Sequence, residues 1–159
     1  IALLKHQDVI LTLVGTGEDS YSSNLRKVAE ERRGERFKVF GPQPFQKVPE
    51  FLAMADVVVI PQRKNLATMG QIPAKVFDAM AMAKPIIATS VCDLPAILDG
   101  CGWIVEPGSP EQLAGAIEYI ITQPEEAEQN GQKAREKCVK NYSWDVVERV
   151  LLEIFSKYE

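Results

Sequence analysis

The sequence contains little of what several common functional sites require. It has one histidine, His6, and three cysteines, none of them spaced as C-x-x-C. A Ser-His-Asp triad, a Cys-His pair or a histidine metal site is therefore not expected, and no metal is assigned. An odd number of cysteines fits neither a disulfide framework nor a zinc knuckle, so we expect free thiols, as in a reducing cytoplasm.

The sequence also lacks an excess of basic residues and a long apolar run. The net charge of −4 argues against binding nucleic acid, because neutralising phosphates needs a basic surface. The longest apolar runs, such as residues 57–61, are too short to span a bilayer, and no charged-then-apolar leader is visible. These features favour a cytoplasmic protein with no nucleic-acid partner.

Short apolar runs alternate with helical stretches along most of the chain. The 159 residues, of which 46% are hydrophobic, suit one globular domain. Strands are predicted at residues 9–15, 37–40, 56–61, 85–89 and 102–105. Runs that are apolar throughout are typical of strands buried on both faces. The alternation therefore predicts an α/β fold with a doubly wound parallel sheet.

The last third of the chain predicts a helical tail. Ser109, followed by proline, is a typical helix start, and Gln112 is expected to complete a capping box with it. That helix should end before Pro124. A highly charged helix over residues 125–140 is expected to be solvated, and Ser143 is expected to cap a last helix whose apolar residues recur at helical spacing.

Ligands of open parallel sheets bind beyond the carboxyl ends of the strands. Four loops meet that description: residues 15–17, 41–42, 62–73 and 89–94. Gly15 and Gly17 allow a tight turn and close approach of a ligand, although G-x-G after a strand is often an ordinary turn. The loop at 62–73 exceeds the usual length of about 2–6 residues, carries Arg63 and Lys64, and leads into a helix start with unpaired amides. A diphosphate fits that combination; a solvated loop with scattered lysines is the simpler alternative.

Asp78 lies in the most apolar helical segment, where a charged residue needs a partner. It could accept hydrogen bonds from sugar hydroxyls, or it could pair internally with Lys75 on the same helix face. We favour the contact with a sugar.

Together these segments resemble the carboxyl-terminal domain of GT-B-fold glycosyltransferases, specifically the retaining class called family 4. The segment VFDAMAMAKPIIAT, residues 76–89, is similar to that family's apolar helix, proline and strand. Four further pieces follow the family's order: DVILTLVGTGEDS, VFGPQPFQKVPEFLAMADVVVIPQR, VCDLPAILDGCGWIVEPGSPEQLAGAI and NYSW. The resemblance implies one Rossmann-like donor-binding domain over residues 1–159.

The resemblance also implies an activity and a set of site residues. The family transfers a hexosyl group, with retention, from a nucleotide-diphosphate sugar to a saccharide or lipid-linked acceptor, and no cofactor is implied beyond that donor. Asp78 is implied to bond the ribose, residues 70–72 to meet the phosphates and sugar through their amides, and residues 40–42 to lie near the base. The full donor-binding prediction is Gly15, Gly17, Phe40, Gly41, Pro42, Gly70, Gln71, Ile72, Lys75 and Asp78.

Several departures from the family pattern limit what is implied. The family's first signature carboxylate falls at Gly70 and is absent, the second is Asp78 rather than glutamate, and Ala96 stands where glutamate is frequent. The family's Arg and Lys, which neutralise the leaving diphosphate, are expected upstream of this chain, so no catalytic residue is assigned. We therefore expect this fragment to bind nucleotide diphosphates weakly and to transfer no sugar.

The family's first strand and its amino-terminal acceptor domain are also expected to be missing here. That strand lies between those predicted at 9–15 and 56–61, so these two strands should either pair directly or accept a strand from another chain. The resemblance places the full protein in the cytoplasm, with peripheral association at the inner face of the membrane as an open option.

Two alternatives to a transferase remain. A nucleotide-sugar epimerase of the same fold would need its own acid and base groups. A degenerate nucleotide-sugar-binding module would need no catalytic group, and the missing carboxylate at Gly70 keeps that alternative open.

Overall fold

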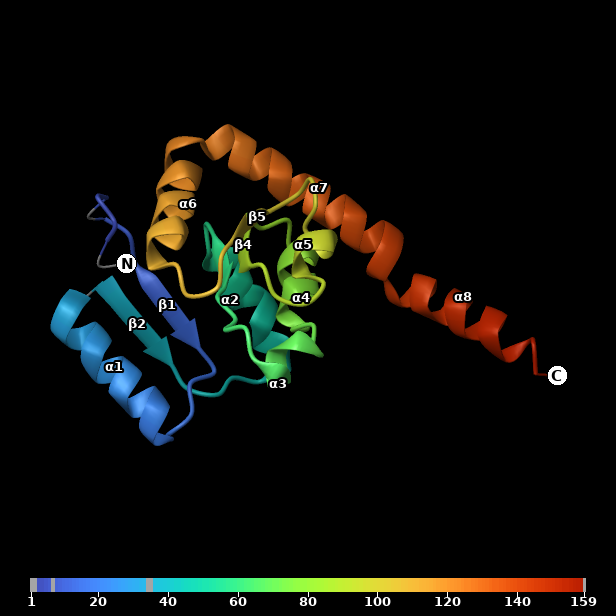
Figure 1. Ribbon diagram of the computed structural model, residues 1–159, viewed down its shortest axis with the longest axis horizontal. Helices are drawn as coiled ribbons and strands as arrows, with labels where there is room; N and C mark the ends of the chain where they lie inside the picture. Colours follow the sequence, from blue (N-terminus) through green and yellow to red (C-terminus); the bar gives the residue numbers. More distant parts are fainter. Residues whose placement is uncertain (1–2, 7, 34–35, 159) are drawn as a thin grey trace.

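The computed structural model describes residues 3–6, 8–33 and 36–158 (Figure 1). In chain order its elements are β1 (Leu11–Val14), α1 (Ser20–Arg33), β2 (Phe37–Phe40), a short 3-10 helix η2 (Phe45–Lys47), α2 (Val48–Met54), β3 (Val58–Ile60), α3 (Leu66–Met69), α4 (Lys75–Ala81), β4 (Ile86–Thr89), α5 (Leu94–Ile97), β5 (Trp103–Val105), α6 (Pro110–Thr122), α7 (Pro124–Tyr142) and α8 (Trp144–Phe155). Each predicted strand is present: β2 has its full predicted length, and the other four are one to three residues shorter than predicted.

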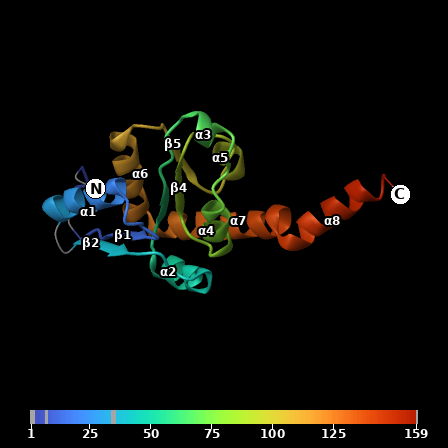
Figure 2. The same ribbon diagram turned by 90° about the horizontal axis from the view of Figure 1, so that it is seen from below.

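The strands in the described ranges pair in parallel, as predicted, but they form two sheets rather than one. β1 pairs with β2, and β3, β4 and β5 follow one another in the second sheet. Figure 2 shows β1 and β2 running across the direction of β4 and β5, and no described strand pairing joins β1 to β3. Of the two expected alternatives, direct pairing of these two strands is therefore wrong, and pairing with a strand of another chain stays a prediction.

The second sheet has helices on both of its faces. Successive side chains of a strand point to opposite faces. Accordingly Ile86 and Ala88 of the buried strand β4 join a core cluster with α4, α5 and α7, whereas Ile87 joins a cluster with α6. This arrangement confirms the doubly wound α/β fold.

Helix α7 crosses the ends of two of these helices. Arg135 donates to the carbonyl of Ala81 at the end of α4. Lys137 Nζ donates to the carbonyls of Ala96 (3.0 Å), in the last turn of α5, and of Asp99 (3.1 Å), just after that helix. Cations suit the carboxyl ends of helices, where backbone carbonyls lack intrahelical partners. The helix expected to be solvated thus has one charged face in water and one buried face of small residues, namely Ala127, Gly131, Ala134 and Cys138.

The start of α6 departs from the expected capping box. The Ser109 side chain accepts a hydrogen bond from the Gln112 amide at 3.4 Å, as predicted. The Gln112 side chain, however, accepts from the amide of Glu106 at 2.9 Å. The Ser109 amide already donates to the Glu106 carbonyl, so it leaves the glutamine free to bind elsewhere.

The segment before β1 is attached to α6 through one carboxylate. The backbone amides of Lys5 and His6 both donate to Glu118, and the His6 ring contacts the other Glu118 oxygen. Burial disfavours the charge on Glu118, but the hydrogen bonds from this segment outweigh that effect and lower its pKa below the ordinary value of 4.5. Leu4 is buried beside them, against α6.

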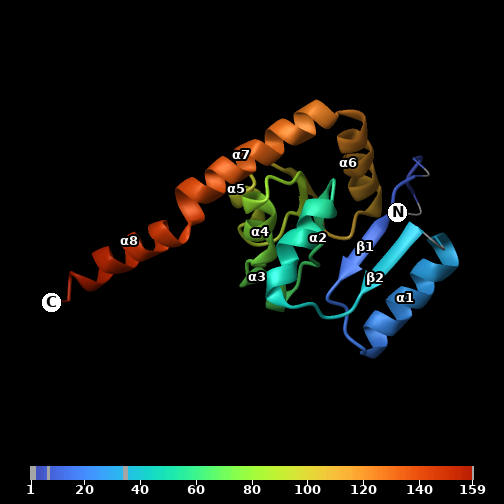
Figure 3. The same cartoon turned by 180° about the vertical axis from the view of Figure 1, so that it is seen from behind.

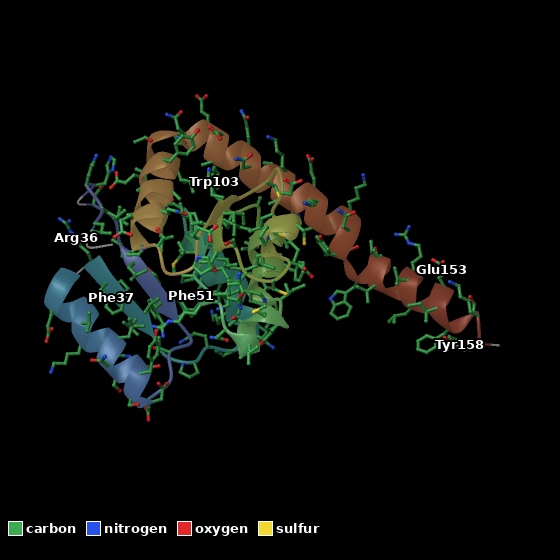
Figure 4. The ribbon with its side chains drawn as sticks, in the orientation of Figure 1. Arg36, Phe37, Phe51, Trp103, Glu153 and Tyr158 are labelled. Atoms are coloured by element: carbon green, nitrogen blue, oxygen red, sulfur yellow. The ribbon has the colours of Figure 1, made fainter. Side chains whose placement is uncertain are left out.

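The last helix extends away from the rest of the domain (Figures 1 and 3). Ser143 occupies the expected N-cap position of α8, but its side chain makes no capping hydrogen bond. The expected apolar residues are largely exposed, among them Val147, Val150, Leu151, Ile154 and Phe155. Figure 4 shows Glu153 and Tyr158 at this outer end. Within the described ranges, no helix has the length and apolar character needed to cross a membrane.

Candidate functional site

The loops that follow β1 and β2 form one unit. The parallel register places Val14 beside Phe40, so the two strands end together. The Gly15 amide donates to the carbonyls of Phe40 (3.1 Å) and Gly41 (3.3 Å). Gly15 has φ +85, a left-handed conformation that favours glycine.

The structure thereby brings half of the predicted donor-binding residues together. These residues are Gly15, Gly17, Phe40, Gly41 and Pro42. The same unit contacts α2, because the rings of Phe40 and Phe51 meet edge to face with centroids 5.0 Å apart. Figure 4 shows Phe51 between the β1–β2 unit and the rest of the domain.

The start of α1 is fixed beside the first of these loops. The Asp19 carboxylate accepts hydrogen bonds from the Ser22 amide (3.0 Å) and the Ser22 hydroxyl (2.7 Å). These two bonds hold the pKa of Asp19 below its ordinary value. Nothing in the spacing of the sequence singles out Arg26, one turn further along α1, yet its guanidinium binds the loop at Thr16 and Gly17. Only the return of α1 along the β1–β2 unit creates that contact.

The long loop after β3 is partly helical, which corrects the expectation of an irregular connection over residues 62–73. Asn65 and Thr68 form a reciprocal capping box that starts α3 inside it. The beginning of the loop is held to the sheet, since the Thr89 hydroxyl donates to the Gln62 carbonyl at 2.9 Å. The length and charge of this loop were the features noted in the sequence. The signal for α3 was the spacing of Asn65 and Thr68, which is that of a capping box.

The other half of the predicted residues lies between α3 and α4. Gly70 and Gln71 are exposed, and Ile72 is half-buried against the core. Lys75 is exposed at the start of α4, and Asp78 is half-buried one turn later. In the described part of the chain no ion pair joins these two charged residues, so the internal pair considered from the sequence is absent here.

Backbone groups at the start of α4 are only partly satisfied. The amides of Val76 and Phe77 donate to the carbonyls of Pro73 (3.0 Å) and Ala74 (2.9 Å). Among the described residues, the amides of Ala74 and Lys75 have no hydrogen-bond acceptor. Two of the expected unpaired donors are therefore present, next to an exposed lysine.

Two glycines, one in each half of the predicted set, leave the backbone accessible. A Cβ built at Gly41 or at Gly70 would meet no atom within 4 Å, and neither residue has positive φ. Their value for the fold is therefore small, and a ligand could approach either backbone closely. Across the described ranges, no hydrogen bond, ion pair or ring contact joins the two halves of the set, and no three His, Cys, Asp or Glu residues cluster as metal ligands would.

Comparison with known proteins identifies relatives over most of the chain. Residues 1–123 match the family model described as "Glycosyl transferases group 1". Alpha-maltose-1-phosphate synthase of Mycolicibacterium smegmatis is 28% identical over 147 residues, covering 87% of this chain and 36% of its own length. The probable glycosyltransferase WbjE of Pseudomonas aeruginosa is 29% identical, covering 76% of this chain and 30% of its own. The chain thus spans about a third of the length of these relatives.

Solved structures share the fold. HepE of Anabaena in complex with UDP and glucose has a TM-score of 0.84 at 20% identity, covering 98% of this chain and 42% of its own. Sucrose-phosphate synthase from Thermosynechococcus elongatus has a TM-score of 0.82 at 22% identity, covering 93% and 38%. A third structure is the carboxyl-terminal domain of the group 1 family protein LpcC from Francisella tularensis, with a TM-score of 0.72 at 22% identity. The match covers 88% of this chain and 73% of that domain. With a family model matching well over half of its residues, and with the fold of a GT-B carboxyl-terminal domain, the chain belongs to the glycosyl transferases group 1 family.

Proposed function

We propose that this chain binds the nucleotide-diphosphate sugar of a glycosyltransferase, which as a whole protein transfers a hexosyl group with retention to a saccharide or lipid-linked acceptor. Membership of the group 1 family supports the transferase class. Nucleotide binding is supported by a structure of the same fold, HepE in complex with UDP and glucose. The proposal assigns the donor to the carboxyl ends of the strands, where parallel sheets bind their ligands.

The observation that carries this proposal is the accessible backbone beside Lys75. The exposed loop at Gly70 leads to the unpaired amides of Ala74 and Lys75, and the lysine adds positive charge. Amide donors next to a cation suit the oxygens of a diphosphate. Asp78 follows one turn later and is proposed to accept hydrogen bonds from the ribose hydroxyls.

Calorimetric titration with uridine and with UDP tests the two assigned roles. Lys75→Ala should weaken UDP and leave uridine nearly unchanged, with a loss that shrinks at high salt because Lys75 is exposed. Asp78→Asn should weaken both ligands by about 1–3 kcal/mol, the range for hydrogen bonds to charged groups. Equal, small effects of both substitutions on both ligands would contradict this assignment.

Two glycine substitutions test whether the ligand touches the backbone. Gly41→Ala and Gly70→Ala introduce methyl groups into open space, so neither should lower the melting temperature. Each substitution should nevertheless lower the affinity for UDP if the backbone at that position approaches the ligand. Gly115→Ala, at an exposed position in α6, is the matched control and should leave UDP affinity unchanged. Unaltered affinity in both loop variants would place the ligand elsewhere.

Binding without transfer is the expected behaviour of this chain alone. Transfer needs the acceptor held against the donor, and the curated relatives are about three times as long as the part matched here. Incubation with labelled UDP-glucose and candidate acceptors should therefore give no product. Measurable transfer by this chain would overturn that expectation.

A further inference from the structure

A single guanidinium group holds the first predicted donor loop. Arg26 lies in α1, and its Nη2 donates to the Thr16 carbonyl (3.2 Å), the Thr16 hydroxyl (2.8 Å) and the Gly17 carbonyl (3.0 Å). Its Nε is buried without a partner among the described residues. The described hydrogen bonds of the Arg26 side chain therefore all come from one nitrogen, Nη2, and all go to the loop.

The contact extends to the second loop through Thr16. The Thr16 hydroxyl accepts a hydrogen bond from Arg26 and in turn donates its own hydrogen to the Phe40 carbonyl at 3.3 Å. The amides of Gly15 (3.1 Å) and Thr16 (3.4 Å) donate to the same carbonyl. Arg26, Thr16 and Phe40 thus form a continuous path from α1 through both loops.

The described hydrogen bonds of Arg26 all go to this loop. No carboxylate pairs with Arg26 in the part of the chain that the structure describes. Hydrogen bonds in which the donor is charged are about twice as strong as neutral ones. These bonds reach ten and nine residues back along the chain, to Thr16 and Gly17, and so join the helix to the loop that precedes it.

We propose that Arg26 is a positioning residue for the nucleotide donor, fixing residues 15–17 and, through Thr16, residues 40–42. This role rests on the proposed function, and Arg26 acts through the loops without touching the ligand. The consequence is that donor affinity depends on a residue of α1 that lies outside the predicted binding set.

Four variants of the chain test the proposal: Arg26→Ala, Arg26→Lys, Thr16→Val and the control Lys27→Ala, an exposed neighbour on α1. UDP affinity is measured by calorimetry, and amide exchange at residues 15–17 by mass spectrometry. Arg26→Ala should weaken UDP on the order of tenfold, the equivalent of one charged hydrogen bond, and should raise exchange in the loop. Arg26→Lys should restore part of both effects, because an ammonium can still donate to the loop carbonyls.

Thr16→Val keeps the side-chain shape and replaces the hydroxyl with a methyl group, so it tests the link from Arg26 to Phe40 apart from any folding defect of Arg26→Ala. It should weaken UDP in the same direction by a smaller factor, whereas Lys27→Ala should bind like the unmodified chain. If the unmodified chain binds UDP and both Arg26→Ala and Thr16→Val bind it equally well, the positioning role is overturned by itself. If the unmodified chain binds no UDP, the proposed function falls, and the role with it. Unchanged exchange at residues 15–17 in Arg26→Ala would also overturn the role, whatever the affinity.

Discussion

Two glycines inside helices lead to opposite predictions for the same substitution. Gly131 is buried in α7, and a Cβ built there would lie 2.2 Å from the Ala83 carbonyl oxygen and 2.9 Å from its carbon. Gly115 is exposed in α6, and a Cβ there would meet no atom within 4 Å. The two positions share a helical backbone and differ only in what lies beside them.

The expected magnitudes follow from that difference. Alanine is favoured over glycine inside a helix by about 1 kcal/mol. At Gly115 nothing opposes this gain, so Gly115→Ala should raise the melting temperature by about 2–4 °C, the shift per kcal/mol for a chain of this size. At Gly131 the added methyl group meets backbone, and overpacking costs about 1–3 kcal/mol or more.

The backbone facing Gly131 has little freedom to retreat. Ala83 already has φ 53, and α7 is held nearby by the hydrogen bonds of Arg135 and Lys137. Moving α7 outward would lengthen those bonds. A Cβ 2.2 Å from a backbone oxygen puts the overpacking cost at the upper end of that range, about 3 kcal/mol. Subtracting the propensity gain of about 1 kcal/mol leaves a destabilisation of about 2 kcal/mol, with a fall in melting temperature of about 4–8 °C.

Urea unfolding followed by circular dichroism, with thermal melts alongside, measures both variants against the unmodified chain. Opposite signs for the two substitutions support the close packing of α7 on the turn after α4. A Gly131→Ala chain as stable as the Gly115→Ala chain would refute it, because the helical gain would then be unopposed at both sites.

Three further results are expected. Burial raises the pKa of Cys101 and Cys138, so a maleimide at neutral pH should label the partly exposed Cys92 first and the other two only on unfolding; equal rates for all three would contradict this. Because the pKa of Glu118 is lowered in the folded chain, its contribution to stability is fully present above the ordinary value of 4.5 and is lost as the pH falls through the lowered pKa. Glu118→Gln should therefore make the melting temperature less dependent on acid pH. An unchanged pH profile would show that Glu118 is not the group responsible. Removing residues 144–158 should leave the unfolding free energy nearly unchanged and reduce self-association measured by light scattering, because this helix exposes its apolar residues; a large loss of stability would show that the helix packs on the domain.

The local pattern of the sequence was sufficient for the elements and the fold class. Short runs rich in β-branched and aromatic residues identified the strands. The expected burial on both faces holds for β4, whereas β1 and β2 alternate more buried with exposed residues. Serine and proline positions identified helix starts, since these residues act on the backbone within a few positions of themselves. The same local chemistry marked the glycine loops and the lysine at Lys75 as candidates for binding a diphosphate.

Contacts between segments that are distant in the chain could not be predicted from the sequence in the same way. The separation of the strands into two sheets depends on which edges align in space, and apolar character is the same for either arrangement. The link from Arg26 to Thr16 and Phe40 joins a helix and two loops. No spacing rule relates those positions.

The sequence by itself determined the α/β class, the parallel strands and the family, because each depends on short-range periodicity and on residue types in a fixed order. Only the tertiary structure decided that α7 buries its small residues against α4, that α8 extends away from the domain, and that Arg26 holds the first donor loop. These outcomes depend on which surfaces meet after the elements have formed. From the sequence alone, a side chain such as Arg26 can donate its hydrogen bonds to water or to any carbonyl. The fold decides which carbonyl lies within hydrogen-bond distance.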